Sequence, residues 1–435
     1  MAKKRRVEKP KEYTRRQLSH FQKQKRRQRI VFISGMAIIA AIIVITLAGW
    51  YIGEYRPLHK TVIKVKDTEF NTSYFIELLK IYGASQPGQS LEAFVNGAQE
   101  GVVENELKKQ AAQGYGITVN DEEIKAELKE NGAPVNRVYV DLSRGQKLET
   151  KLKDDYFGPE IPASDNQVHM MTMLTESEAV AQELRSKLIM GDNFTALAGE
   201  YAQNYYSKNV NKGDFGWHPQ TVLEAQLGSL IPIDYAFMAQ AGDISPPLSD
   251  NVSYKQLGYW VIKVLSMSED EEAEVQALYL GSRHQALEIK ARLESGDNLS
   301  ALAKQYSQYS TSKENGGELG TVAKPASAND TSISTAFDTY VFDPATELGN
   351  WSEPVRDTAL WTQGGAWIVQ LVEKQDNREL SAGDRSFIIN QVYSEWLSQL
   401  KIMQAAEVDT SGLTEEVVTW MVERATRELQ QAARG

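Results

Sequence analysis

The stretch Gly191-Asp-Asn-Phe-Thr-Ala-Leu-Ala-Gly-Glu-Tyr201 returns almost letter for letter as Gly296-Asp-Asn-Leu-Ser-Ala-Leu-Ala-Lys-Gln-Tyr306. The match continues downstream, where Trp260-Val-Ile-Lys-Val264 corresponds to Trp367-Ile-Val-Gln-Leu371. A period of about 105 residues is too long for a solenoid repeat and fits a small domain used twice. The sequence therefore predicts two tandem copies of one domain.

Each copy has the pattern of a mixed domain. The residue patterns predict a strand, two helices, a glycine turn, a short helix and two final strands. This order is typical of a compact α+β unit with an antiparallel sheet. We place the first copy at residues 163–268 and the second at 270–375.

An uncharged apolar segment runs from Ile30 to Tyr51, and about twenty such residues suffice to cross a bilayer as a helix. Residues 1–29 hold thirteen Lys and Arg against Glu8 and Glu12, a net charge of +11. Because the whole chain carries −11, the part after this tail carries −22. The positive-inside rule then predicts a basic cytoplasmic tail (1–29), a single-pass transmembrane helix (30–52) in the cell membrane, and an extracytoplasmic remainder.

The N-terminal region has two other possible roles. A cleaved signal peptide fits poorly, because the apolar run is too long and no small-x-small cleavage site follows Gly49. The basic tail could instead contact anionic lipid or nucleic acid. The acidic charge of the remainder argues against nucleic acid as a partner of that part.

Composition excludes several chemistries. The chain has no cysteine, so disulfides and thiolate catalysis are impossible. Its five histidines show no metal-ligand spacing, and neither a phosphate-binding loop nor a Gly-x-Ser-x-Gly elbow is present. We therefore expect no metal and no cofactor.

Helical patterns flank the two copies. Residues 53–162 read as a helical module, with predicted helices at 72–82, 91–113, 122–131 and 138–156. Residues 376–435 read as C-terminal helices, of which 386–406 has one apolar face. That face must be buried, so we expect 386–406 to return and complete the helical module.

The two copies resemble parvulin-type peptidyl-prolyl cis-trans isomerases over nearly their whole length. The matching motifs are Val168-His169, Tyr201-Ala-Gln-Asn-Tyr-Tyr-Ser207, Gly213-Asp-Phe-Gly216 and Gly258-Tyr-Trp-Val-Ile-Lys-Val264 in the first copy, and Tyr306-Ser-Gln-Tyr-Ser-Thr-Ser312 and Gly349-Asn-Trp-Ser-Glu-Pro354 in the second. The flanking helices resemble the chaperone module of SurA- and PrsA-type foldases. A preceding membrane anchor resembles PpiD-type foldases, which implies the protein translocation channel as a partner.

The resemblance implies two facing histidines and a nearby Asp or Cys as the isomerase machinery, and the chain departs from this pattern. By strand alignment the first histidine is His169 in copy one and Gln276 in copy two, and the second is replaced by Trp260 and Trp367. Asn204 and Tyr309 stand at the Asp/Cys position. His169, helped by Ser207, would polarise a prolyl carbonyl, or it is a packing residue inside the sheet.

Aromatic and aliphatic residues of the first copy are candidates for peptide binding. Together they would line an apolar groove, or they would form a packed core: Trp217, Leu230, Phe237, Tyr259 and Trp260.

Three functions remain open at this point. The protein is a holdase chaperone for unfolded secreted or membrane polypeptides, a prolyl isomerase acting through the first copy, or a non-catalytic assembly partner of a membrane complex. Both copies have lost polar residues at the isomerase positions of the family pattern, and this loss favours the holdase chaperone.

Overall fold

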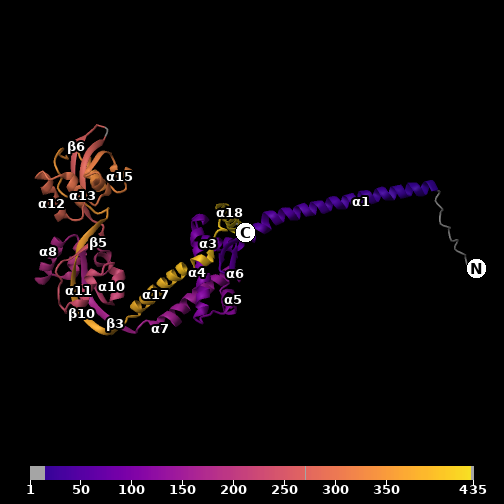
Figure 1. The fold of residues 1–435 in the computed structure, drawn as a ribbon, viewed down its shortest axis with the longest axis horizontal. Coiled ribbons are helices and arrows are strands. Elements are labelled where there is room, and N and C mark those ends of the chain that lie inside the picture. The colour runs from indigo at the N-terminus through magenta and orange to yellow at the C-terminus, as the bar shows by residue number, and fades with distance from the viewer. Residues whose placement is uncertain (1–14, 270, 433–435) are drawn as a thin grey trace, which may run out of the picture. The chain divides into compact units, whose positions relative to one another are not determined.

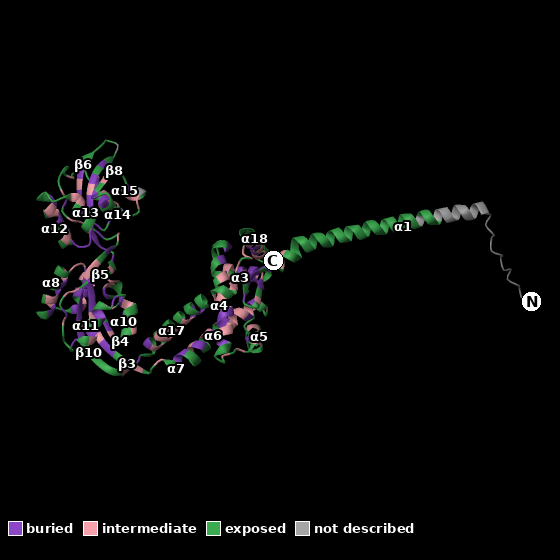
Figure 2. Ribbon diagram, in the orientation of Figure 1, coloured by how far each residue is buried: buried purple, intermediate pink, exposed green. Residues whose placement is uncertain are grey.

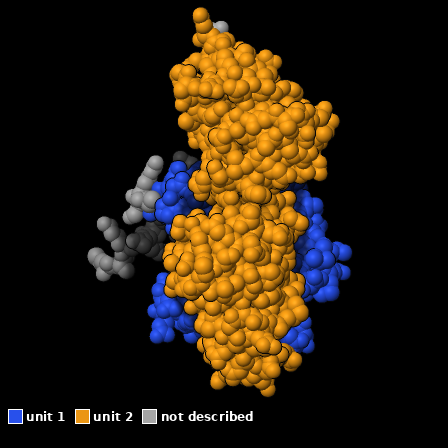
Figure 3. All heavy atoms as spheres, turned by 90° about the vertical axis from the view of Figure 1, so that its left-hand side faces the viewer, with its two compact units in different colours: residues 1–158, 392–435 blue, residues 159–391 orange. Residues whose placement is uncertain are grey.

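The fold was taken from a computed structural model, which describes residues 15–269 and 271–432. Residues 1–14 of the predicted basic tail and residues 433–435 of the predicted C-terminal segment lie outside this range. The chain divides into two compact units (Figure 3). Unit 1 comprises residues 1–158 and 392–435, and unit 2 comprises residues 159–391.

Unit 1 is mainly helical, with a small three-stranded antiparallel sheet in the order β11-β1-β2. The elements before unit 2 are α1 (Arg15–Trp50), the π-helix η1 (Tyr51–Tyr55), α2 (Arg56–Leu58), β1 (Thr61–Val65), β2 (Thr68–Asn71), α3 (Thr72–Ser85), the 3-10 helix η2 (Leu91–Phe94), α4 (Val95–Gly114), α5 (Asp121–Glu130), α6 (Arg137–Lys151) and the π-helix η3 (Leu152–Phe157). Those after it are the end of α17 (Ala382–Met403), η5 (Ala405–Glu407), β11 (Val408–Asp409) and α18 (Glu415–Ala432).

Asparagine side chains fix where the helices of unit 1 begin. Asn71, Asn120 and Asn136 precede α3, α5 and α6, and each side chain accepts a hydrogen bond from a backbone N–H of the first turn. Such caps satisfy donors that the helix itself leaves unpaired. These starts agree with the predicted helices at 72–82 and 122–131.

The end of α17 packs within unit 1 through its apolar face. Tyr393, Leu397 and Leu400 are buried, and the Trp396 indole N–H donates to the Tyr115 hydroxyl at 3.1 Å. The following helix, α18, lies against α3, where Lys80 and Glu428 form an ion pair of 3.2 Å. The C-terminal segment is thus part of the helical unit.

Among the residues that the structure describes, one helix is long and apolar enough to cross a membrane. It runs from Lys25 to Leu58 through α1, η1 and α2, and the apolar window contains no buried residue. Figure 2 draws the described part of this helix as exposed. Its length and composition agree with the predicted span at 30–52.

Unit 2 contains two four-stranded antiparallel sheets (Figure 1). Its elements are α7 (Gly158–Glu160), β3 (Ser164–Thr175), α8 (Glu178–Ile189), α9 (Phe194–Tyr201), the π-helix η4 (Tyr206–Val210), β4 (Asp214–Pro219), α10 (Gln220–Leu227), α11 (Ile231–Met238), β5 (Leu248–Lys255), β6 (Gly258–Met267), β7 (Glu272–Leu280), α12 (Arg283–Glu294), α13 (Leu299–Tyr306), α14 (Ser310–Glu314), β8 (Glu318–Ala323), α15 (Ala326–Asn329), α16 (Thr335–Val341), β9 (Val355–Asp357) and β10 (Thr362–Glu379). Helix α10 was not predicted from the sequence.

The repeated stretch has a structural cause. Asn193 and Asn298, at the same place in the two copies, cap α9 and α13 by accepting the backbone N–H of Ala196 and Ala301. Each cap starts a short helix whose Leu and Ala pack against a sheet. The shared letters therefore encode the same local turn and helix twice.

The two sheets exchange their last strands. Each sheet forms the centre of one lobe of unit 2. The sheet of the first lobe, lobe 1, has the order β4-β3-β10-β5, and the sheet of the second lobe, lobe 2, has the order β8-β7-β6-β9. The last strand of the first copy, β6, thus lies in the second sheet, and the last strand of the second copy, β10, lies in the first. Lobe 1 therefore comprises residues 164–255 and 362–379, and lobe 2 comprises residues 258–357. This arrangement differs from the predicted consecutive domains 163–268 and 270–375.

The loop between the copies explains the exchange. Only Ser268–Glu271 separate β6 from β7, and the Ser268 N–H donates to the Glu272 carbonyl at 2.8 Å. A connection this short joins neighbouring antiparallel strands and cannot lead to a separate domain. Because β6 is thereby held beside β7, the central position next to β3 is filled by the equivalent strand β10.

Two cores, one on each face of the sheet, stabilise each lobe. In lobe 1, Val168, Met170 and Trp367 face α10 and α11, whereas Met173 and Ile368 face α8 and α9. Alternation along β3 accounts for this division, since successive strand residues point to opposite faces.

A buried lysine holds the two crossing connections together. Lys255, at the end of β5, is 1% exposed, and its ammonium donates to the carbonyls of Gln363 and Gly364 at the start of β10. Burial lowers the pKa of Lys255 from 10.5 to about 8, although nearby Glu176 acts in the opposite direction.

This pKa predicts an unusual pH dependence. A lysine whose pKa is lowered by folding destabilises the folded state while charged, so stability should rise as the pH increases from about 8 toward 10.5. We expect a gain of about 3 kcal/mol in the free energy of unfolding of unit 2, measured by urea denaturation. Lys255→Met should flatten the profile between pH 8 and 10. Equal slopes for the two proteins would rule out this amine as the cause.

Candidate functional site

The predicted catalytic histidine lies on β3 in lobe 1. The Nε2 atom of His169 is 2.8 Å from Oδ1 of Asp214, and a quarter of the His169 side chain is exposed. Its cross-strand neighbour on β4 is Trp217, whose ring centroid lies 6.0 Å away. The Arg378 guanidinium lies 4.2 Å from the centroid of the same Trp217 ring. This small polar and aromatic cluster is partly open to solvent.

The predicted groove is not assembled in one place. Val168 and Met170 face α11, so His169, between them, points to the opposite face of the sheet. Phe237 packs on the α11 side, and Leu230, which precedes α11, is 43% exposed. His169 and Trp217 therefore do not share a groove with these two residues.

Tyr259 and Trp260 lie in the other lobe, so their assignment to a peptide groove of the first copy is wrong. Strand exchange carries them on β6 into the second sheet, where they are 5% and 0% exposed. The Tyr259 hydroxyl donates to Glu176 at 2.9 Å, and burial together with this carboxylate raises the pKa of Tyr259 to about 12. Both side chains are core residues.

Ser207 supports the backbone and has no bond to His169. Its buried hydroxyl donates to the Thr172 carbonyl and accepts from the Asn204 side chain, each at 2.7 Å. Asn204 in turn accepts the Leu174 N–H at 3.0 Å. The pair that sequence reasoning placed near the chemistry therefore anchors β3 to the loop after α9.

Equivalent hydrogen bonds in lobe 2 correct the alignment of the copies. Ser312 donates to the Ala277 carbonyl as Ser207 does to Thr172, and the Gln308 N–H donates to Tyr279 as the Gln203 N–H does to Leu174. Both pairs are offset by 105 residues. The counterpart of His169 is therefore Glu274, and the pairing of His169 with Gln276 is wrong by two residues.

The positions of the second histidine hold buried tryptophans. The Trp367 indole N–H donates to Oδ2 of Asp250 in lobe 1, and the Trp260 N–H donates to Oδ2 of Asp357 in lobe 2, both at 2.9 Å. Ser229 and Ser334 donate to the same two carboxylate oxygens. Each tryptophan thus binds an exchanged strand to the lobe that receives it, a role that the sequence patterns did not reveal.

Tyr309 also belongs to the core of lobe 2. It is buried beside Trp260, with ring centroids 5.4 Å apart, and its hydroxyl bonds to Asp330 at 2.5 Å. Within residues 15–269 and 271–432, no cluster of three His, Cys, Asp or Glu side chains is positioned to hold a metal ion.

Comparison with known proteins places these features in a family. The PPIC-type PPIase domain model matches residues 261–375, a range that begins inside β6 and ends inside β10. The chain is 30% identical over 156 residues to the foldase protein PrsA of Geobacillus kaustophilus, covering 35% of this chain and 47% of that protein. It is 24% identical over 334 residues to the chaperone SurA of Hahella chejuensis, covering 74% and 69%.

Through these matches the chain resembles the parvulin-type foldases PrsA and SurA. It spans about half the length of the first PrsA relatives. A crystal structure of PrsA from Bacillus anthracis aligns with 83% of this chain and 98% of that one at 11% identity. The TM-score of this alignment is 0.23.

Proposed function

We propose that this protein is a membrane-anchored extracytoplasmic foldase that assists translocated proteins mainly by binding unfolded segments. The observation that carries the proposal is the pair of buried Trp–Asp hydrogen bonds. Trp260 and Trp367 replace the second histidine of the family pattern and are inaccessible to a substrate. Neither lobe then offers two facing histidines to a prolyl amide, while both lobes keep an intact fold.

Exposed apolar side chains of lobe 1 support binding of unfolded chains. Met238 at the end of α11 is 77% exposed, Val210 at the end of η4 is 58% exposed, and Leu230 is 43% exposed. Apolar side chains on a surface contribute to association when they are removed from water by a partner. Extended client segments rich in aliphatic and aromatic residues are the expected ligands.

The proposed architecture has three parts beyond the basic tail. A single transmembrane helix precedes a SurA-like helical module, which α17 completes, and two parvulin-like lobes follow in the exchanged arrangement. Tethering would raise the local concentration of the foldase around emerging chains without any new contact. On this proposal the translocation channel is a neighbour in the membrane.

Two assays on the full chain in nanodiscs test this function. We expect suppression of aggregation of an unfolded secreted protein at near-stoichiometric amounts, and no acceleration of prolyl isomerisation in a protease-coupled peptide assay. Peptides with and without proline should compete equally for binding. A strict requirement for an X-Pro bond would restore the isomerase, and inactivity in both assays would favour a pure assembly partner.

An isomerase acting through lobe 1 is the second candidate, because His169 is partly exposed and hydrogen-bonded to Asp214. A carboxylate partner orients an imidazole for proton or dipole work. Since His169 faces away from α11, we expect neither the parent protein nor His169→Ala to accelerate isomerisation, and we expect His169→Ala to keep aggregation suppression within about twofold of the parent. Loss of a measurable isomerase rate in this variant, with Asp234→Asn as the surface control, would instead assign catalysis to His169.

A further inference from the structure

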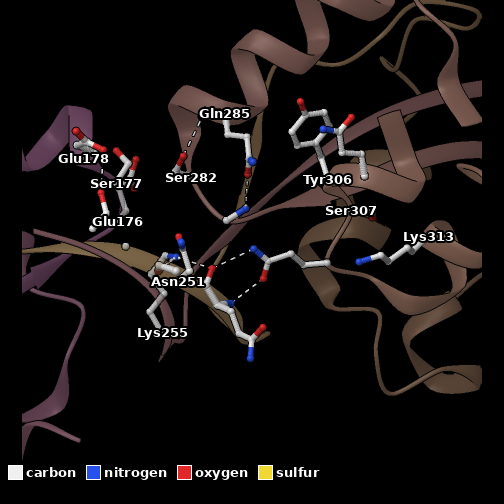
Figure 4. A pocket seen from close by; sticks show the side chains of 17 residues that line it. Glu176, Ser177, Glu178, Asn251, Lys255, Ser282, Gln285, Tyr306, Ser307 and Lys313 are labelled. Carbon is white, nitrogen blue, oxygen red and sulfur yellow. Dashed lines mark hydrogen bonds between the residues drawn. The ribbon is translucent and has the colours of Figure 1, made fainter. Parts of the chain in front are cut away.

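A pocket lined by unit 2 residues lies where the two lobes meet (Figure 4), and His169 is not among the residues that line it. Its volume is about 430 Å³, within the range of small-ligand sites. One wall comes from lobe 1, at the start of α8, the end of β5 and the start of β10. The other comes from lobe 2, around the starts of α12 and α14 and the end of α13. Neither lobe forms this pocket alone.

Direct bonds between the lobes fix its walls. The Gln308 side chain accepts the Gln363 N–H at 2.7 Å and donates to the Gln363 carbonyl at 3.0 Å, which copies the pairing of two strands. On the other wall, Glu176 accepts bonds from the Tyr259 hydroxyl and the Arg283 N–H. Together with the strand exchange, these bonds hold the pocket ready for a ligand, which lowers the entropy cost of binding.

The charges that line the pocket balance. Glu176 and Glu178 stand on the lobe 1 wall, while Lys255 lies at the floor and Lys313 on the lobe 2 wall. Two carboxylates and two amines give no net charge, so the net charge of the pocket favours neither an anion nor a cation as the ligand. A neutral, hydrogen-bonding ligand fits this balance.

Side-chain carboxamides in the pocket indicate which kind of neutral ligand it would bind. The side-chain amides of Asn251, Gln305 and Gln363 line the pocket, are exposed to solvent, and make no hydrogen bond to another described residue. Each offers two N–H donors and one carbonyl acceptor. These are the groups that pair with the C=O and N–H of a peptide bond, whatever its side chains.

We propose that the inter-lobe pocket binds the main chain of an extended, uncharged polypeptide segment. This inference rests on the proposed chaperone function and specifies a second way of holding a client, through its backbone. It complements the exposed apolar side chains of lobe 1, which would contact the side chains of the client. A foldase with both contacts would hold segments of widely different sequence.

The test uses the full chain in nanodiscs and a fluorescein-labelled hexapeptide of alternating Gly and Ser with blocked ends. Fluorescence anisotropy should show saturable binding that N-methylation of the peptide amides abolishes. The double variant Asn251→Ala/Gln305→Ala should weaken binding about tenfold. Gln240→Ala, which removes an exposed amide outside the pocket, should leave it unchanged.

Absent binding, or binding that survives N-methylation or the double substitution, would overturn the pocket proposal. If aggregation suppression persists in that case, the proposed function stands without this site. If the hexapeptide binds as expected but no client is protected from aggregation, the pocket stands and the chaperone function fails.

Discussion

Cysteines substituted at residues 263 and 276 are expected to form a disulfide almost completely, and so are cysteines at 171 and 370. Lys263 is the cross-strand partner of Gln276 in lobe 2, and Met171 is the partner of Gln370 in lobe 1. Directly opposed residues of antiparallel strands have Cβ atoms about 5 Å apart, close enough for a bridge after small adjustments. The native chain has no cysteine, so no competing disulfide can form.

The matched controls re-pair the same four positions. If each copy kept its own last strand, residue 276 would face 370 and residue 171 would face 263. Oxidation of Gln276→Cys/Gln370→Cys and Met171→Cys/Lys263→Cys should therefore leave the thiols free. Mobility on denaturing gels and peptide mass spectrometry read out all four variants. Bridges in the control pairs, and none in the first two, would show that the strands are not exchanged.

Side-chain size, in addition to the short loop between β6 and β7, favours the exchange of β6 and β10. Tyr259 and Ala366 occupy equivalent strand positions, immediately before Trp260 and Trp367. Ala366 is fully buried against α8 and α9 in lobe 1, whereas Tyr259 packs against α12 and α13 in lobe 2. Returning β6 to lobe 1 would force a tyrosine into space filled by an alanine, and overpacking of this kind typically costs about 1–3 kcal/mol.

Local structure was predictable from the sequence, and strand partnership was not. Capping asparagines such as Asn120 and Asn193 mark helix starts within a few residues of their positions, because a cap is a local interaction. The repeat revealed two copies, yet similar copies contain interchangeable strands. The deciding signal was the short Ser268–Glu271 link, which reads as a hairpin rather than as a boundary between domains.

The candidate site shows the same limit. His169 stood out because it matches the first histidine of the parvulin pattern, but its alternation with Val168 and Met170 already placed it on the other face from α11. Ser207 matched a family motif for reasons of backbone support. The inter-lobe pocket has no sequence signature at all, since its residues are brought together only by the contact of two lobes.

Replacing Asp250 is expected to cause a large loss of stability in lobe 1. This fully buried carboxylate accepts five hydrogen bonds, from the Trp367 indole, the Ser229 and Ser253 hydroxyls, and the Val252 and Ser253 N–H groups. Asp250→Asn keeps the shape but turns one acceptor into a donor. At least one buried donor then lacks a partner, and we expect a loss of about 3 kcal/mol in urea unfolding.

The acid limb of the stability profile provides an independent readout of the same carboxylate. Burial alone would raise the pKa of Asp250, but the donors outweigh it and lower the pKa from 3.8 to about 2. A carboxyl group with a lowered pKa stabilises the fold above pH 3.8, and this contribution, about 2 kcal/mol, is lost as the pH falls toward 2. Asp250→Asn should remove that part of the slope, whereas exposed Asp234→Asn should change neither stability nor slope. A parent-like unfolding midpoint for Asp250→Asn would mean that the Trp367–Asp250 bond does not secure β10 in lobe 1.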